Sequence, residues 1–186
     1  YHEELNPEGE GAAIYGDVDF EPWLESYPPV SCCSNVLFLP GIEASRLYLA
    51  EDGSENRLWE PNRNLDIEKL YLNSEGGSKN SGIYTRDVIE EGLGVQNIYK
   101  TFSNNMDALV AEGTINEWQA YAYDWRQSVN DVVENGTRYQ NSVIPLVETL
   151  KVLAKNSKSG KVTIVAHSNG GLLAKALLKK LQADKE

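Results

Sequence analysis

The stretch that most limits the possible folds is KVTIVAHSNGGLLAKALLKKL, at residues 161–181. Its first part, residues 161–167, is interpreted as a strand of the kind that a parallel sheet buries on both faces. Residues 169–182 have the apolar spacing of a helix, and Gly170 and Gly171 stand near the turn between the two. A buried strand that leads directly into a helix indicates a βαβ-type arrangement around a parallel sheet.

Two further segments are interpreted as strands of the same sheet. Residues 35–41 (NVLFLPG) are apolar up to the terminating Pro40 and Gly41, and residues 118–125 (WQAYAYDW) form the other segment. Strands that alternate with helices predict the fold class α/β, with a parallel sheet that carries helices on both faces. The sheet would be incomplete, with strands near 35–41, 118–125 and 161–167.

Two helices are expected between these strands. The first covers residues 103–113, with Ser103 as N-cap and Gly113 in the left-handed position that follows the helix. The second covers roughly residues 137–156, where Pro145 either starts the regular part or introduces a kink. Its apolar stripe would consist of Val143, Val147, Leu150 and Ala154.

The N-terminal region differs in composition from the rest. Residues 1–30 are acidic and rich in Gly, Glu and Pro, which predicts a linker or tail from a preceding module. Within it, GDVDFEPWL at residues 16–24 resembles the closing stretch of parallel β-helix repeat modules. Cys32 and Cys33 are adjacent, and because a disulfide between neighbours is strained, we expect free thiols or a bridge to a partner outside the chain.

The formal net charge of −11 argues against nucleic acid as a partner, because phosphate binding needs clustered Lys and Arg. No stretch approaches the roughly 18 apolar residues of a membrane span, although peripheral contact with a membrane surface stays open. No targeting segment is readable, so the compartment is not fixed, and a secreted or cell-surface location is slightly favoured. We expect no metal and no cofactor.

The turn at AHSNGG has the form of a nucleophile elbow, in which a serine stands between a strand and a helix. Ala166 and Gly170, two residues before and after Ser168, are small enough to let strand and helix approach. A glycine-rich turn without chemistry is one alternative. A phosphate-binding turn is another, but the lysine and the glycine spacing of such turns are missing. Acyl transfer through Ser168 is therefore favoured.

Four segments in this order resemble the lecithin:cholesterol acyltransferase family of α/β-hydrolases. They are VLFLPGIEASRLY at residues 36–48, LWEPN at 58–62, YAYDWR at 121–126 and VTIVAHSNGG at 162–171. The resemblance covers roughly residues 35–182.

This resemblance implies that a serine attacks a lipid ester and that the acyl group then passes to an alcohol or to water. The catalytic residue would be Ser168, and the oxyanion hole would use the backbone N–H groups of Ile42 and Asn169. The substrate would be a lipid or another ester. Hydrolase and transferase activity stay open, because the choice depends on how well water is excluded from the acyl-enzyme.

A serine nucleophile needs a base and an orienting acid, which follow it in α/β-hydrolases in the order Asp or Glu, then His. After Ser168 the sequence has Asp184 and Glu186 but no histidine. His167 precedes a turn that directs its side chain away from the serine, so we interpret it as structural; His2 lies in the N-terminal tail. We therefore expect residues 31–186 to be the N-terminal half of a hydrolase domain, with base and acid further along the chain. By itself this half would lack a complete triad. The alternative to an enzyme is a catalytically silent α/β-hydrolase-like binding module.

Two other features have structural interpretations. Asp124 and Arg126 flank a tryptophan at a strand end, and a structural ion pair is favoured over substrate contact. Residues 43–100 form a long excursion, interpreted as an insertion or a cap over an acyl site. Its aromatic residues could equally form a small core of their own. The apolar wall of the acyl site would consist of Tyr48, Trp59, Tyr71 and Tyr84.

Overall fold

The computed structural model describes residues 33–184, except residues 52, 62–64 and 93–95. The expected tail at residues 1–30, which includes the repeat-like stretch at 16–24, lies outside the described residues, as does Cys32. Cys33 is disulfide-bonded. The expectation of a free thiol is therefore wrong at Cys33, and the sequence contains one other cysteine, Cys32.

A three-stranded parallel sheet contains all three segments that were predicted as strands. It consists of β1 (Asn35–Leu39), β7 (Trp118–Ala120) and β10 (Val162–Ala166), in the order β10-β1-β7. β1 pairs with β10 over its whole length, from Asn35 opposite Val162 to Leu39 opposite Ala166. The chain therefore leaves β1 and β10 at the same edge of the sheet, and the two turns that follow lie side by side.

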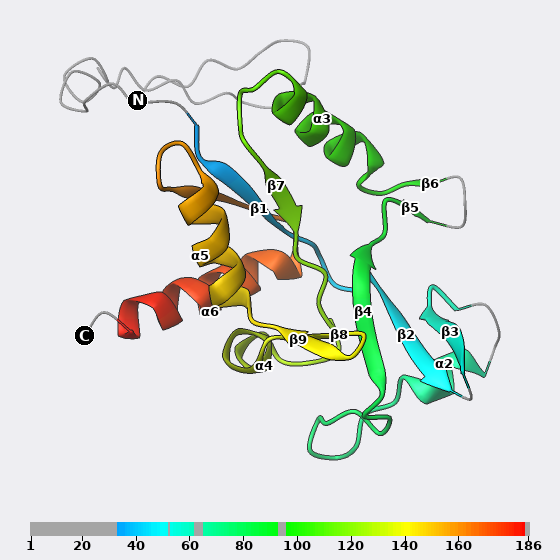
Figure 1. The fold of residues 1–186 in the computed structure, drawn as a ribbon. Coiled ribbons are helices and arrows are strands. Elements are labelled where there is room, and N and C mark those ends of the chain that lie inside the picture. Colours follow the sequence, from blue (N-terminus) through cyan, green and yellow to red (C-terminus); the bar gives the residue numbers. More distant parts are fainter. Residues whose placement is uncertain (1–32, 52, 62–64, 93–95, 185–186) are drawn as a thin grey trace, which may run out of the picture. The chain divides into compact units, whose positions relative to one another are not determined.

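Helices cover both faces of this sheet (Figure 1). Leu37 and Leu39 of β1 face α5 (Leu146–Asn156) and α6 (Asn169–Ala183). Phe38, between them in sequence, packs on the opposite face with Tyr99 and with Phe102 of α3 (Lys100–Ala111). The main core on the first face combines aliphatic residues, among them Leu146, Leu153, Leu173 and Leu177, with the buried rings of Tyr121 and Tyr123. The expected α/β class is confirmed, and the assignment to an α/β-hydrolase-type sheet stays a prediction.

The excursion after β1 forms a second, antiparallel sheet. β2 (Ser45–Glu51) is its middle strand, between β3 (Ser54–Trp59) and β4 (Ile83–Val88). The short helix α2 (Asp66–Lys69) follows β3, and a small hairpin of β5 (Glu91–Gly92) and β6 (Gln96–Asn97) precedes α3. The region has its own core, which is aliphatic: Leu47, Leu49, Leu58, Leu70 and Ile83. Among the described residues, three of the four sheets are antiparallel, so the parallel sheet is a smaller share of the fold than expected.

The single helix predicted over residues 137–156 is wrong in its first part. The helix α4 (Val129–Asn135) ends before this range. Residues 137–144 then form a hairpin of β8 (Thr137–Tyr139) and β9 (Ser142–Ile144), and α5 begins after it. Gly136 ends α4 with a φ of 74°, and the β-branched residues of the hairpin favour extended backbone. Pro145 is the N-cap of α5, so the alternative in which it starts the helix is confirmed. The fully buried residues of α5 are Leu146, Thr149 and Leu153. Of the predicted stripe, Val147 and Leu150 are partly buried and pack against the same core, whereas Val143 is exposed.

Two other boundaries also differ. α3 begins at Lys100, so Ser103 lies inside the helix, and within the described chain its buried hydroxyl has no hydrogen-bond partner. The left-handed conformation at Gly113 is confirmed by a φ of 72°. The strand expected over 118–125 ends at Ala120, because side chains accept the later backbone N–H groups. Tyr123 N–H donates to Ser45 Oγ and Asp124 N–H to Thr137 Oγ1.

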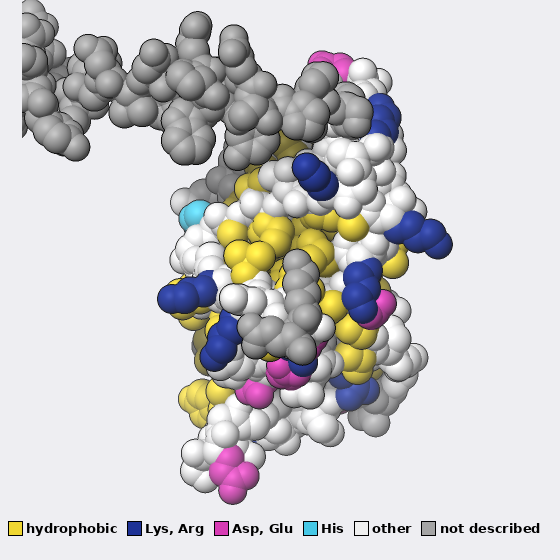
Figure 2. All heavy atoms as spheres, turned by 90° about the vertical axis from the view of Figure 1, so that its left-hand side faces the viewer, with side chains coloured by type: hydrophobic (Ala, Val, Ile, Leu, Met, Phe, Trp, Pro, Cys, Tyr) yellow, Lys and Arg dark blue, Asp and Glu magenta, His cyan; other side chains and the backbone are white. Residues whose placement is uncertain are grey.

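The outer edge of β10 pairs with no other strand in the part of the chain that the structure describes. Although its sequence is that of a fully buried strand, Thr163 and Ala166 are exposed and the remaining residues are only partly buried. Figure 2 views the side that carries α5 and α6 and shows hydrophobic side chains gathered in one area. Exposed apolar residues of these helices are Val152, Leu172 and Leu178.

The two neighbouring leucines Leu177 and Leu178 test the assignment of the core. Leu177 is 0% exposed and Leu178 is 58% exposed, on the same helix. We expect Leu177→Ala to lower the free energy of unfolding by about 2–5 kcal/mol because it leaves a cavity. Leu178→Ala should change it by less than about 0.5 kcal/mol. Urea denaturation measures both, and equal effects would contradict the assignment of this helix face.

Candidate active site

Ser168 stands at the turn between β10 and α6 in an unusual backbone conformation. Its φ is 52° and its ψ −122°, although it is not a glycine. Such a conformation costs about 1–3 kcal/mol, so the surrounding structure must hold it in place. Ser168 is the N-cap of α6 but its side chain makes no capping hydrogen bond, and the residue is exposed. Its hydroxyl is therefore accessible to a ligand.

The turn after β1 packs against this serine. A Cβ atom at Gly41 would lie 3.2 Å from Cβ of Ser168 and 3.0 Å from Nδ1 of His167. On the other side of the turn, a Cβ atom at Gly170 would lie 2.1 Å from the carbonyl oxygen of Leu39. The backbone N–H of His167 donates to the same carbonyl over 3.0 Å. Glycine at positions 41 and 170 thus permits the two turns to meet.

Ile42 and Asn169, the predicted oxyanion-hole residues, lie on these two turns. Ile42 directly follows Gly41 with a side chain that is 57% exposed, and Asn169 is the first residue of the 15-residue helix α6. Within the described chain neither backbone N–H donates a hydrogen bond. The partial positive charge of a helix N-terminus favours an anion beside Asn169. The structure brings the two turns together, and their joint role as an oxyanion hole stays a prediction.

His167 contacts Tyr99 rather than Ser168. Its Nδ1 lies 2.8 Å from the hydroxyl oxygen of Tyr99, and the two rings meet edge to face. No hydrogen bond joins the His167 ring to Ser168 among the described residues, which agrees with its interpretation as a structural histidine. The described residues also contain no group of three His, Cys, Asp or Glu residues that could hold a metal ion.

Two tyrosines that the sequence analysis did not assign to the site connect the two turns. Tyr99 Oη accepts a hydrogen bond from the backbone N–H of Gly41 over 3.0 Å. Tyr123 Oη donates to the carbonyl oxygen of Pro40 over 3.1 Å and accepts from Nδ2 of Asn169 over 2.9 Å. Burial raises the pKa of both hydroxyls, more than the N–H donors of Gly41 and Asn169 lower it, so both stay protonated at neutral pH. The sequence contained one signal for this pair: Tyr123 stands in an apolar segment, which favours a buried side chain.

Asp124 and Arg126 form the buried ion pair that the sequence suggested. Arg126 Nη2 lies 2.6 Å from Asp124 Oδ2, and Nε donates to the other carboxylate oxygen over 2.9 Å. Arg126 also donates through Nη1 to the carbonyl oxygen of Leu70, in the excursion after β3. The pair is internally satisfied and ties the excursion to the strand end, which supports its structural interpretation.

An apolar cavity of about 410 Å³ adjoins the candidate site. Ile42 and His167 belong to its lining, and Trp59 is the one residue of the expected aromatic wall that does. Tyr48 and Tyr84 instead stack on each other, with hydroxyls bonded to Asp87 and Glu55, and Tyr71 is 55% exposed. The expected wall is therefore wrong for three of its four residues. The cavity is lined mainly by other apolar residues: Ala44, Pro61, Ile89, Ile98 and Tyr99.

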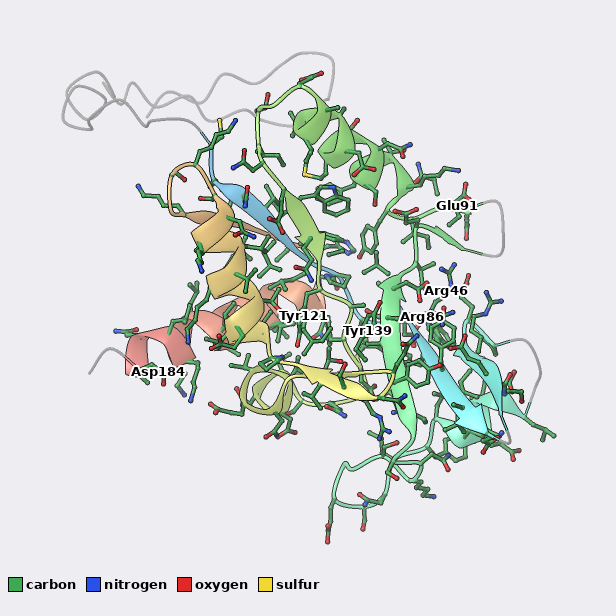
Figure 3. The ribbon with its side chains drawn as sticks, in the orientation of Figure 1. Arg46, Arg86, Glu91, Tyr121, Tyr139 and Asp184 are labelled. Atoms are coloured by element: carbon green, nitrogen blue, oxygen red, sulfur yellow. The ribbon has the colours of Figure 1, made fainter. Side chains whose placement is uncertain are left out.

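A larger cavity of about 810 Å³ contains charged side chains, among them Arg46, Arg86 and Glu91 (Figure 3). Its charges largely balance one another. Arg46 pairs with Asp87 at 2.8 Å and with Glu60 at 3.2 Å, and Arg86 pairs with Glu55 at 2.7 Å. This lining suits an acyl chain far less well than the apolar cavity does.

The chain thus combines an α/β fold with an exposed serine at a strand-to-helix turn. The family model of lecithin:cholesterol acyltransferase matches residues 77–185, which is more than half of the chain. The chain belongs to the lecithin:cholesterol acyltransferase family. The match includes YAYDWR and VTIVAHSNGG, whereas the other two quoted segments lie before it. No curated protein and no solved structure shows a significant match.

Membership in this family indicates an enzyme of the lipid acyltransferase or hydrolase type, with lipids as substrates. In the described part of the chain, no helix is both long and apolar enough to cross a membrane.

The adjacent glycines Gly170 and Gly171 provide a test of the turn geometry. Gly170→Ala should lower the free energy of unfolding by about 1–3 kcal/mol, because the new methyl group must displace backbone atoms of Leu39 and Pro40. Gly171→Ala meets no atom within 4 Å and should stabilise α6 by about 0.5–1 kcal/mol. Urea denaturation compares the two, and a neutral Gly170→Ala would show that the turns are not packed as described.

Proposed function

We propose that the protein is a serine-dependent lipid-ester hydrolase or O-acyltransferase that works through an acyl-enzyme on Ser168. The observation that carries the proposal is the exposed, positive-φ serine at the start of α6, packed against the turn that bears Ile42. This arrangement is the one expected of a nucleophile elbow in an α/β-hydrolase. The parallel sheet with helices on both faces supports that fold type.

The proposed reaction has two stages. Oγ of Ser168 attacks the ester carbonyl carbon while a base takes its proton, and negative charge develops on the carbonyl oxygen. The N–H groups of Ile42 and Asn169 donate to this oxygen, and each preplaced donor is worth about 3 kcal/mol. The intermediate then collapses, the substrate alcohol leaves with a proton, and the acyl group stays on the serine. Water or another alcohol then attacks the acyl-enzyme and frees Ser168.

The base and the acid would come from chain beyond residue 186, in a second half of the same domain. The open edge of β10 supports this part of the proposal. β10 has the composition of a central strand, yet within the described chain it pairs on one side only. An unpaired edge with apolar side chains is stabilised when a further strand covers it.

The acyl chain of the substrate would occupy the apolar cavity of about 410 Å³. Three observations support this assignment: the lining is mainly apolar, Ile42 and His167 connect it to the site, and its remaining walls come from the excursion after β1. In this sense the excursion serves as the cap over an acyl site. Acyl chains that outgrow the cavity would bind less well.

The nucleophile is tested by Ser168→Ala in the full-length protein. Because the acyl-enzyme cannot form, we expect the rate of hydrolysis of a p-nitrophenyl ester to fall at least about 1,000-fold. A fluorophosphonate probe should label the wild type and not the variant. Ser142→Ala, at an exposed position of β9, is the control and should keep the wild-type rate.

The outcome of this test also separates the enzyme from a silent binding module. A wild-type protein without esterase activity and without probe labelling would favour the silent module. An undiminished rate in Ser168→Ala would remove this serine from the mechanism. Residues 1–186 alone should react with the probe far more slowly than the full-length protein, since the proposed base is missing.

The acyl cavity is tested by enlarging a residue in its wall. Ile98 is 47% exposed and lines the cavity, so Ile98→Trp can reduce the space without overfilling the core. We expect kcat/KM for a C12 ester to fall about 10-fold while that for a C4 ester changes less than about two-fold. Ile67→Trp is the matched control, at 46% exposure on α2 and outside the cavity lining. An equal loss for both esters would contradict the assignment.

A further inference from the structure

We infer that Tyr99 and Tyr123 are positioning residues whose hydroxyls hold the turn after β1 and the turn after β10 at a fixed separation. The inference rests on the proposed function, because the two turns carry the proposed oxyanion donors. Neither tyrosine would touch the reacting atoms. Each would act through the groups that it bonds, which are backbone groups on the turn after β1 and a side chain on the turn after β10.

Tyr99 joins the residues that directly precede Ile42 and Ser168. Its hydroxyl oxygen accepts the N–H of Gly41 and lies 2.8 Å from Nδ1 of His167. Accepting the N–H uses one lone pair, so the O–H can donate to Nδ1 when the imidazole carries its proton on Nε2. One hydroxyl thus bonds both turns within one residue of each functional position.

Tyr123 makes a second connection between the same two turns. Its O–H donates to the carbonyl of Pro40, and its oxygen accepts from the side chain of Asn169. The four bonded positions are 40 and 41 on one turn and 167 and 169 on the other. Positions 167 and 169 flank the proposed nucleophile Ser168, and positions 40 and 41 directly precede the proposed donor at Ile42. Two bridges of this kind restrict sliding and opening of one turn against the other.

The rings themselves are held firmly, which a positioning role requires. Tyr123 is 0% exposed, and Tyr99 is 8% exposed with an edge-to-face contact to Phe38 at 4.9 Å. The two residues reach the site from separate parts of the chain, before α3 and after β7. Because the rings pack in the core, replacement by phenylalanine removes the bridge and keeps the packing.

The test compares Tyr99→Phe and Tyr123→Phe in the full-length protein. We expect each change to lower kcat per titrated active site about 10- to 100-fold, because small displacements of catalytic groups have effects of this size. KM should change less than about two-fold. The affinity for a trifluoromethyl ketone, whose serine adduct places an oxyanion in the hole, should fall in parallel with kcat/KM. In Tyr99→Phe, the amide hydrogen of Gly41 should also exchange faster.

Tyr121→Phe is the matched control. Tyr121 is also buried and also donates its hydroxyl to a backbone carbonyl, that of Ile144 at 2.7 Å, but it bonds neither turn (Figure 3). Its kcat and ketone affinity should stay within about two-fold of the wild type. If both test variants lose only thermal stability and keep kcat per active site, the tyrosines are structural and the inference is overturned.

Ser168→Ala separates this inference from the proposed function. If Ser168→Ala is inactive and the tyrosine variants keep the wild-type kcat, the proposed function stands and the positioning role falls. If Ser168→Ala keeps the wild-type rate, both fall together.

Discussion

The contact between Gly170 and the carbonyl oxygen of Leu39 sets how closely α6 approaches the parallel sheet. A side chain at position 170 would begin 2.1 Å from that oxygen, so any larger residue would push the helix away from β1. Leu173 and Leu177 follow on the same face of α6 and are fully buried with Leu37 and Leu39. The main core and the exposed turn at Ser168 therefore depend on the same close approach. Strain at the serine is tolerated because the burial of this helix face outweighs it.

Local sequence was sufficient to predict the parts of the fold whose signal is local. The apolar runs ending at Leu39 and Ala166 predicted two strands, and the small residues around Ser168 predicted the sharp turn. The hairpin at residues 137–144 could not be found in this way. Its apolar residues fit a helical spacing as well as an extended one, and short segments of this kind are decided by tertiary packing.

The components of the candidate site that were missed depend on long-range contacts. Tyr99 bonds Gly41 across 58 residues and Tyr123 bonds Pro40 across 83 residues, and no spacing rule predicts such pairs. The aromatic wall failed for a different reason. Tyr48 and Tyr84 have polar hydroxyls that bond carboxylates in the antiparallel sheet, so their rings stack there and do not line the cavity. That the His167 ring does not bond Ser168 could be predicted, because the geometry of its own turn decides the direction of its side chain.

Tyr99 links the apolar cavity to the proposed oxyanion hole, since its side chain lines the cavity while its hydroxyl bonds Gly41. An acyl chain in this cavity would contact the ring that fixes the turn before Ile42. Binding of the chain and placement of the backbone donor would then not be independent, because a ring packed on both sides moves less than one with a void beside it. In the proposed function, part of the binding energy of the acyl chain would hold the donors in place when charge develops, which is how remote contacts raise kcat rather than only lower KM. The excursion after β1 would in this way contribute to the chemistry although it supplies no reacting group.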